Sequence, residues 1–247
     1  PVSVTQHGAT LTVDGCGGRF PAETAELACG NSGTSLRFLA AMVAAAGRGP
    51  YRLDGNARMR QRPAADLVQA LNGLGAFASS ELGTGCPPLL IRAEGPGLDG
   101  GFAFVKGDVS SQFLSALLMA LPLAKNPSSI EVEGELVSKP YVTMTMSVME
   151  AFGATISNRD FKRFNIRPAL YKATDYAIEP DASAASYFWA LAAVSGGSVR
   201  VAGLSGESVQ GDVAFVDVLE HMGCRVDRNR RGIRVTGGTL RGVDVDM

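Results

Sequence analysis

The chain has 247 residues and a formal net charge of −1, with 46% hydrophobic and 19% charged residues. This composition is typical of a folded α/β protein and excludes disorder for most of the chain. The balanced charge argues against a general nucleic-acid or anionic-membrane binder, which would need an excess of Lys and Arg. No apolar run approaches the ~20 residues of a membrane span, and nothing at the start resembles a cleavable signal, so we expect a cytoplasmic location.

The four cysteines are widely separated. Cys16, Cys29, Cys86 and Cys224 lie 13, 57 and 138 residues apart, which matches neither a zinc-site spacing nor a disulfide framework. We therefore predict free thiols and no metal site.

The predicted elements begin with a hairpin of two short strands, at 2–5 and 10–13. An apolar helix follows the segment GNSGTS and ends at Gly47, and an amphipathic helix runs from Pro63 to Gly75. Two alternating strands come after it. This succession predicts strand, helix, strand, helix, strand, strand.

The same order recurs twice. In the second copy, an apolar helix follows SSQ and stops at Pro122, a strand covers 129–132, a helix runs from Pro140 to Gly153, and strands cover 154–157 and 161–166. In the third copy, an apolar helix follows DASAAS, a strand covers 198–201, and an amphipathic helix ends at Gly223. Thr34, Ser111 and Asp181 are predicted N-cap or first-turn residues of the apolar helices. Residues 242–247 resemble the opening strand of a further copy.

The repeat defines the expected fold class. Gly75, Gly153 and Gly223 are 78 and 70 residues apart and are typical of left-handed helix C-caps. We predict an α/β protein of repeated βαβαββ units, in which the apolar first helices are buried and small mixed sheets surround them. Residues 1–178 form an incomplete first domain, and 179–247 form part of a second domain with one full unit and the start of the next. The chain is expected to be an internal piece of a longer protein.

Polar residues gather where the apolar helices begin. Asn31, Gly33 and Thr34 open the first apolar helix, and Ser110, Ser111 and Gln112 open the second. Helix capping needs only one such side chain, and free N–H groups at a helix N-terminus bind phosphate or carboxylate. Ordinary capping is the alternative interpretation.

A cluster of positive charge directly precedes the amphipathic helix of the first copy. The segment RMRQRP contains Arg58, Arg60 and Arg62, and Arg62 precedes a proline, so we expect it to be extended. In the next copy, VSKPY places Ser138 and Tyr141 at the equivalent position. An anion-binding cleft shared between repeats accounts for these residues better than a solvated loop.

These motifs carry a family resemblance. The segments GNSGTSLR, RMRQRP, SSQFLSALLMALPLA, VSKPYVTMT, DASAASYF and QGDVAFVDVLEHMG, in this order, resemble 5-enolpyruvylshikimate-3-phosphate synthase over essentially the whole chain. The resemblance implies the inside-out α/β barrel of the enolpyruvyl transferases. It also implies transfer of the enolpyruvyl group of phosphoenolpyruvate to the 5-hydroxyl of shikimate 3-phosphate, with release of phosphate, in the pathway to chorismate and aromatic amino acids.

The resemblance also implies roles for individual residues. The residues matched to shikimate 3-phosphate contacts are Ser110, Ser111, Gln112, Ser138 and Tyr141. Those matched to phosphoenolpyruvate contacts are Asn31, Gly33, Thr34, Arg62 and Gln112. Arg37 and Asp181 are expected to form a supporting polar pair. No cofactor is implied, and the full-length protein is expected to be a monomer.

The family's proton-transfer groups have no counterpart in the sequence, so we expect this piece to bind substrates without turning them over. Two alternatives stay open. One is the sister transferase that acts on UDP-N-acetylglucosamine, although Ala57 occupies the position of its loop cysteine. The other is a non-catalytic repeat scaffold that binds an anion.

Overall fold

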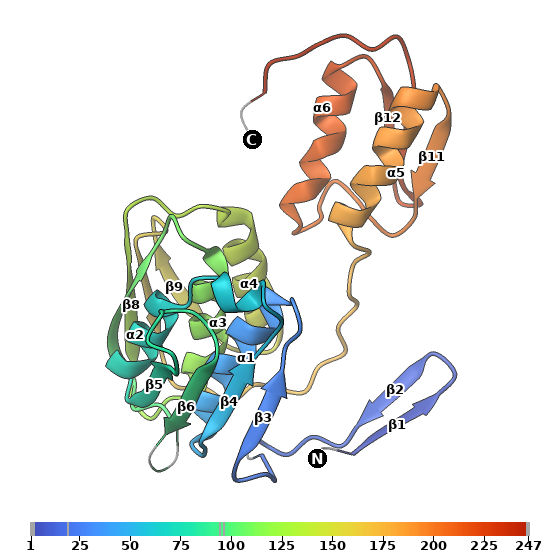
Figure 1. Cartoon of the computed structure of the whole chain (residues 1–247). Coiled ribbons are helices and arrows are strands. Elements are labelled where there is room, and N and C mark those ends of the chain that lie inside the picture. Colours follow the sequence, from blue (N-terminus) through green and yellow to red (C-terminus); the bar gives the residue numbers. More distant parts are fainter. Residues whose placement is uncertain (1–2, 19, 94, 96, 246–247) are drawn as a thin grey trace. The chain divides into compact units, whose positions relative to one another are not determined.

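A computed structural model describes residues 3–18, 20–93, 95 and 97–245 (Figure 1). The chain divides into two compact units, Pro1–Thr174 and Asp175–Met247.

The first unit begins with the predicted hairpin, formed by β1 (Val4–His7) and β2 (Thr10–Val13). The turn between the strands includes Gly8, whose φ of +61° favours glycine. The prediction that the first strand starts at Val2 falls outside the described residues. All eight strand residues are exposed, so the hairpin adds nothing to the core of the unit.

The first complete repeat of unit 1 has the predicted βαβαββ order. It comprises β3 (Ala25–Ala28), α1 (Gly33–Ala46), β4 (Tyr51–Asp54), α2 (Ala65–Gly73), β5 (Ala76–Ser80) and β6 (Leu89–Ala93). A short 3-10 turn, η1 (Met59–Gln61), precedes α2. The sheet order is β3-β4-β6-β5, in which β3 and β4 are parallel and the other pairs are antiparallel.

The second repeat has the same topology. It comprises β7 (Gly101–Lys106), α3 (Ser111–Ala120), the 3-10 turn η2 (Leu121–Leu123), β8 (Ser128–Glu133), α4 (Lys139–Ala151), β9 (Ile156–Arg159) and β10 (Arg163–Ile166). Its sheet order is β7-β8-β10-β9, again with one parallel pair, β7 and β8. The predicted turn at 158–160 was wrong, because Asp160 and Phe161 take φ of +51° and +54° and the turn lies at 160–162.

The helix ends follow local sequence signals. Ser32, Ser110 and Asp181 are the N-caps of the apolar helices, so Thr34 and Ser111 are first-turn residues. Gly75, Gly153 and Gly223 have φ of +95°, +86° and +109°, as predicted for residues that end a helix. Helix α2 begins at Ala65 rather than at Pro63.

The core of unit 1 lies around the apolar helices. Leu36, Ala40 and Val43 of α1 and Phe113, Leu114 and Leu117 of α3 are at most 2% exposed. Burying one such Leu or Phe side chain contributes roughly 2 kcal/mol. The two helices pack against each other, as expected for the first helices of successive repeats.

Unit 2 departs from the predicted repeat. It comprises α5 (Ala182–Ser195), β11 (Ser198–Val201), the 3-10 turn η3 (Gly211–Ala214), α6 (Phe215–His221), β12 (Arg225–Asn229) and β13 (Gly232–Thr236). Its sheet, β11-β13-β12, has three strands and no parallel pair.

The expected opening strand of the third copy is not formed, since residues 167–181 contain neither helix nor strand. Gln210 Nε2 donates to Glu179 Oε2 at 3.0 Å and to the Pro180 carbonyl at 2.8 Å, so this segment is tied to the 208–210 loop instead of β11. Pro180 also has no N–H for a strand ladder. Residues 237–245, which include part of the other expected strand, are likewise irregular.

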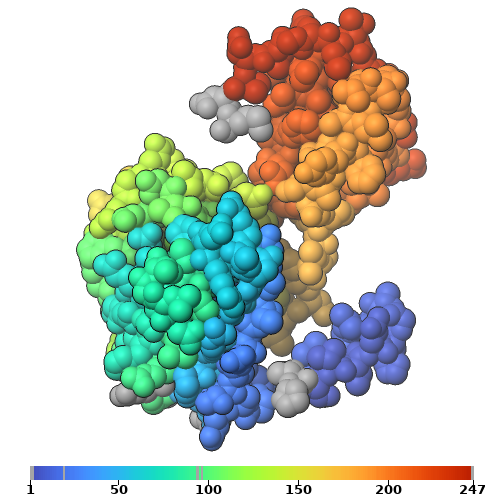
Figure 2. Space-filling view, in the orientation of Figure 1, coloured from blue at the N-terminus to red at the C-terminus, as the bar shows by residue number. Residues whose placement is uncertain are grey.

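Helix α5 was predicted to be buried all round, and this was wrong. Trp189 is fully buried, as predicted, and α5 packs against β11, β13 and α6. The side chains of Tyr187, Phe188, Leu191 and Val194 are 57–78% exposed, and the orange α5 segment lies at the surface of the unit (Figure 2). The reason is that, among the described residues of unit 2, no second apolar helix packs against α5, whereas α1 and α3 of unit 1 cover each other.

The four cysteines are free thiols, as predicted. Across the described residues, no cluster of three or more His, Cys, Asp or Glu side chains could hold a metal ion. No helix in that same part of the chain has the length and apolar character needed to cross a membrane.

Candidate anion-binding site

The candidate site of unit 1 lies where its parallel strands end. The carboxyl ends of parallel neighbours meet at one edge of a sheet. Strands β3 and β4 are therefore followed by adjacent loops, 29–32 and 55–62, and β7 and β8 by the loops 107–110 and 134–138. One backbone hydrogen bond joins the loops of each pair: Asn56 N donates to Gly30 O at 2.9 Å, and Val137 N donates to Gly107 O at 3.0 Å.

Gly55 makes the contact between the first pair of loops possible. A Cβ atom at this position would lie 2.2 Å from the Gly30 carbonyl oxygen. Only glycine lets the two backbones approach this closely. The loop after β4 is thereby held against the segment that leads into α1.

The N-termini of α1 and α3 are adjacent. Gln112, in the first turn of α3, donates from Nε2 to Thr34 Oγ1 in the first turn of α1, at 3.1 Å. Each N-cap uses its hydroxyl locally: Ser32 accepts from Ser35 N at 3.2 Å, and Ser110 accepts from Gln112 N at 3.3 Å. Two helix N-termini place two partial positive charges together, an arrangement that an anion stabilises.

Arg62 lies against the N-terminus of α1. Its backbone is extended, as predicted from the following proline, with φ −89° and ψ 130°. Its Nη1 donates to Asn31 O at 3.5 Å, and a Cβ atom on Gly33 would be 2.6 Å from Nη1 and Nη2. Gly33 therefore leaves the space that the Arg62 guanidinium occupies.

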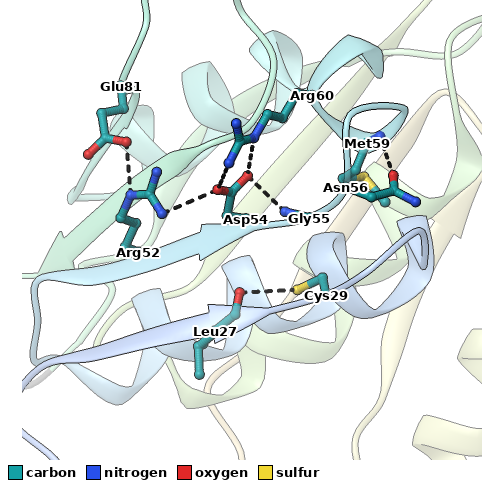
Figure 3. A network of polar contacts seen from close by, with 9 residues as sticks. All are labelled: Leu27, Cys29, Arg52, Asp54, Gly55, Asn56, Met59, Arg60 and Glu81. Carbon is teal, nitrogen blue, oxygen red and sulfur yellow. Dashed lines mark hydrogen bonds and ion pairs between the residues drawn. The ribbon is translucent and has the colours of Figure 1, made fainter.

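The three arginines of RMRQR have different partners. Arg60 binds Asp54 twice, from Nε to Oδ1 at 3.0 Å and from Nη2 to Oδ2 at 2.6 Å (Figure 3). Arg58 donates to Gln61 Oε1 at 3.2 Å. Arg60 is paired with Asp54 and Arg58 with Gln61. Arg62 is therefore the arginine of this segment that faces the N-terminus of α1.

Asp54 anchors this loop and was missed by the sequence analysis. In addition to Arg60, it accepts from Gly55 N at 2.8 Å and from Arg52 Nη1 at 3.2 Å, and Arg52 Nε donates to Glu81 Oε2 at 2.9 Å (Figure 3). Its place at the end of a strand, directly before Gly55, is the signal that could have identified it.

We expect Asp54→Asn to lower the free energy of unfolding by about 1 kcal/mol at neutral pH. The hydrogen bonds from Arg60 hold the pKa of Asp54 below its ordinary value. The ionised carboxylate therefore stabilises the folded state above the unfolded pKa of about 4, and this contribution is lost as the pH falls through the lower folded pKa. Urea unfolding of both proteins between about pH 7 and about pH 2 measures the difference.

The exposed Asp14 supplies the matched control, because Asp14→Asn should leave stability unchanged at both ends of this range. If the free energies of unfolding of wild type and Asp54→Asn differ as much at the acidic end of the pH range as at neutral pH, the role given to the carboxylate is contradicted.

Arg37 adds a second guanidinium. It is 6% exposed, donates from Nη1 to Gln112 Oε1, and lies 5.0 Å from the centre of the Phe113 ring. Burial, and then the charge of Arg62, lower the pKa of Arg37. Among the described residues, neither Arg37 nor Arg62 forms an ion pair. Two guanidinium groups without a carboxylate, beside two helix N-termini, make a site suited to an anion.

Ser138 has an unusual backbone. It is the N-cap of α4 with φ +56° and ψ 42°, a left-handed conformation that is uncommon outside glycine, and its side chain makes no capping hydrogen bond. Tyr141, one turn further, is 46% exposed. Thr145 Oγ1 donates to Tyr141 O at 2.8 Å and pairs with Ser115 Oγ at 2.9 Å, which links the first turn of α4 to α3.

The sequence-predicted residues thus fall into groups. Contacts join Asn31, Gly33 and Thr34 to Arg62, Arg37 and Gln112. Ser110, Ser111, Ser138 and Tyr141 lie in the loops and first helical turns at the carboxyl edge of the second sheet. Asp181 belongs to unit 2, where its Oδ1 accepts from Ala184 N at 2.9 Å. Its pairing with Arg37 stays a prediction.

The fold defines an α/β repeat protein, and the residues described above form a candidate anion-binding site at the carboxyl edges of its parallel strand pairs. The family model of EPSP synthase (3-phosphoshikimate 1-carboxyvinyltransferase) matches residues 1–247. The chain belongs to this family.

Similar proteins support this assignment. The 3-phosphoshikimate 1-carboxyvinyltransferase of Marinomonas sp. (strain MWYL1) is 42% identical, over 99% of this chain and 57% of its own length. That of Laribacter hongkongensis is 47% identical (97% and 56%), and the chloroplastic enzyme of Arabidopsis thaliana 46% (100% and 50%). The solved EPSP synthase of Acinetobacter baumannii has a TM-score of 0.75 at 22% identity, over 99% of this chain and 56% of that one. The chain thus spans about half the length of the curated relatives it matches.

Proposed function

We propose that the chain binds phosphoenolpyruvate and shikimate 3-phosphate, as part of an enzyme that transfers the enolpyruvyl group to the 5-hydroxyl and releases phosphate. The observation that carries the proposal is the pair of adjacent helix N-termini with two guanidinium groups and no carboxylate partner among the described residues. Both substrates carry a phosphate and a carboxylate, and charge-assisted hydrogen bonds to such groups are strong.

The two repeats have different roles in this proposal. The α1 side, with Gly33, Thr34 and Arg62, binds phosphoenolpyruvate, because the guanidinium and the α1 N-terminus converge there. Ser110, Ser111, Ser138 and Tyr141, in the second repeat, bind shikimate 3-phosphate. Gln112 contacts the first repeat from the second and serves both substrates. These groups hold and orient anions, and proton transfer is assigned to none of them.

The family match favours shikimate 3-phosphate over UDP-N-acetylglucosamine as the acceptor. A repeat scaffold that binds any anion is the remaining alternative. Selective binding of shikimate 3-phosphate over inorganic phosphate distinguishes the enzyme site from such a scaffold.

We expect Ser138→Ala to weaken binding of shikimate 3-phosphate about tenfold, because a hydrogen bond to a charged group is lost. The free hydroxyl makes no capping bond, so its removal breaks no internal contact of the helix end. Calorimetric titration of the chain measures the dissociation constant.

Ser147→Ala, in the same helix α4, is the matched control and should bind as wild type does. Equal affinity of wild type and Ser138→Ala would remove Ser138 from the site, and equal affinity of wild type for shikimate 3-phosphate and inorganic phosphate would favour the scaffold.

A further inference from the structure

The amide of Gln112 is held at both ends. Its Nε2 donates to Thr34 Oγ1 at 3.1 Å, and its Oε1 accepts from Arg37 Nη1. The α1 residues Thr34 and Arg37 therefore fix a side chain that belongs to α3. Gln112 is the residue that links the two repeats in the proposed site.

The two partners do not have the same effect on the amide. The hydroxyl of Thr34 can donate or accept, so it is compatible with either orientation of the Gln112 amide. A guanidinium only donates, and a reversed amide would place an NH₂ group against it. Arg37 therefore determines the orientation of the Gln112 amide, with the oxygen toward Arg37 and the NH₂ group on the other side.

The burial of Arg37 makes the reversed orientation of the Gln112 amide unfavourable. Its side chain is 6% exposed, and its guanidinium lies over the ring of Phe113, which is fully buried. Within the described residues of unit 1 it has no carboxylate partner, so the Gln112 oxygen is the acceptor that this unit offers it. Two opposed donors in so buried a place would leave both without a hydrogen bond, which is costly.

We infer that Arg37 is a positioning residue that fixes the Gln112 amide with its NH₂ group free to donate to an anionic substrate. One N–H of Nε2 is used by Thr34, which leaves the second for the ligand. Without Arg37 the amide can reverse and present its oxygen, which repels an anion. The inference rests on the proposed function for the identity of the anion, while the orientation of the amide is independent of it.

The test follows the Gln112 side-chain amide by NMR, assigned from the signal that disappears in Gln112→Ala. We expect two sharp, well-separated NH₂ resonances in wild type, which broaden or shift in Arg37→Met. Arg92→Met is the matched control, because Arg92 also lies over a ring, 5.1 Å from the centre of Phe77, but outside the site. It should leave the Gln112 signals unchanged. Unchanged signals in Arg37→Met would overturn the inference.

Binding supplies the second measurement. With shikimate 3-phosphate present, Arg37→Met should weaken phosphoenolpyruvate binding about tenfold, and Arg37→Lys should recover part of the loss because lysine still donates. In a Gln112→Ala background, Arg37→Met should change affinity less than about twofold, since Arg37 acts through Gln112. A full tenfold effect in that background would overturn the positioning role.

The two proposals can fail separately. If wild type does not bind phosphoenolpyruvate while the Gln112 signals still depend on Arg37, the proposed function fails and the positioning role stands. If wild type and Arg37→Met bind it equally, the positioning role fails and the proposed function stands. Should Arg37→Met not fold, the NMR comparison of Arg37→Lys with wild type decides: shifted or broadened Gln112 NH₂ signals support the inference, and signals identical to those of wild type contradict it.

Discussion

Arg62→Ala will weaken binding of phosphoenolpyruvate about thirtyfold, since the loss of hydrogen bonds to a charged group typically costs about 2 kcal/mol. The guanidinium occupies the space beside Gly33, at the positive end of α1. The alanine variant removes this charge without creating a core cavity, because Arg62 is not buried. Calorimetric titration in the presence of shikimate 3-phosphate measures the effect.

Arg58 provides the comparison within the same loop. It pairs with Gln61 and is exposed, so Arg58→Ala removes an equal charge at a nearby position. We expect its affinity to stay within about twofold of wild type, because exposed charges are screened by solvent and salt. If both variants lost affinity equally, general electrostatic attraction would explain binding and the specific role of Arg62 would be lost.

Trp189→Ala will unfold or strongly destabilise unit 2, by roughly 3–5 kcal/mol. Trp189 is fully buried in a small core with Ala185, Leu204, Val216 and Ile233. Unit 2 comprises only residues 175–247, so its single core leaves little reserve of stability. Hydrogen exchange, read separately for the amides of each unit, should show lost protection in α5 and β13 and unchanged protection in α1 and α3.

Tyr187→Ala is the control for this prediction. Tyr187 lies on the same helix and is 78% exposed, so its truncation removes little buried area and should change protection only slightly. Equal loss of protection in both variants would show that α5 is stabilised by its exposed face, contrary to the packing described above.

Much of the fold could be predicted from the periodic elements. The repeated helix pairs, the hairpins and the glycines at the helix ends follow from local pattern and backbone preference. The missing strand before α5 and the exposed face of α5 could not be predicted in this way. Both depend on which other segments are present to pair or pack, and the apolar residues Tyr187, Phe188 and Leu191 do not encode that.

For the site, the sequence indicated the helix starts because polar residues ahead of an apolar helix exceed what capping needs. It indicated Arg62 because this residue lies in an arginine cluster directly before a proline. It did not indicate the loop anchor Asp54, the need for glycine at position 55, or the contact of Arg37 with Gln112. Asp54 makes its contacts with Gly55 and with Arg60, six positions on, so its place at the end of a strand was the available signal. The other two depend on contacts between residues of different loops or repeats, such as Arg37 and Gln112, which are 75 positions apart. Local pattern carries no information on such pairs.

We propose that the N-termini of α1 and α3 form, together with Arg62, one binding site for an anion. Titrating the ¹⁵N-labelled chain with phosphoenolpyruvate, in the presence of shikimate 3-phosphate, tests this directly. We predict the largest shifts for the backbone amides of Gly33, Thr34, Ser111 and Gln112. Shifts confined to the arginine-rich strands β12 and β13, or no saturable shift in the four amides, would contradict the account.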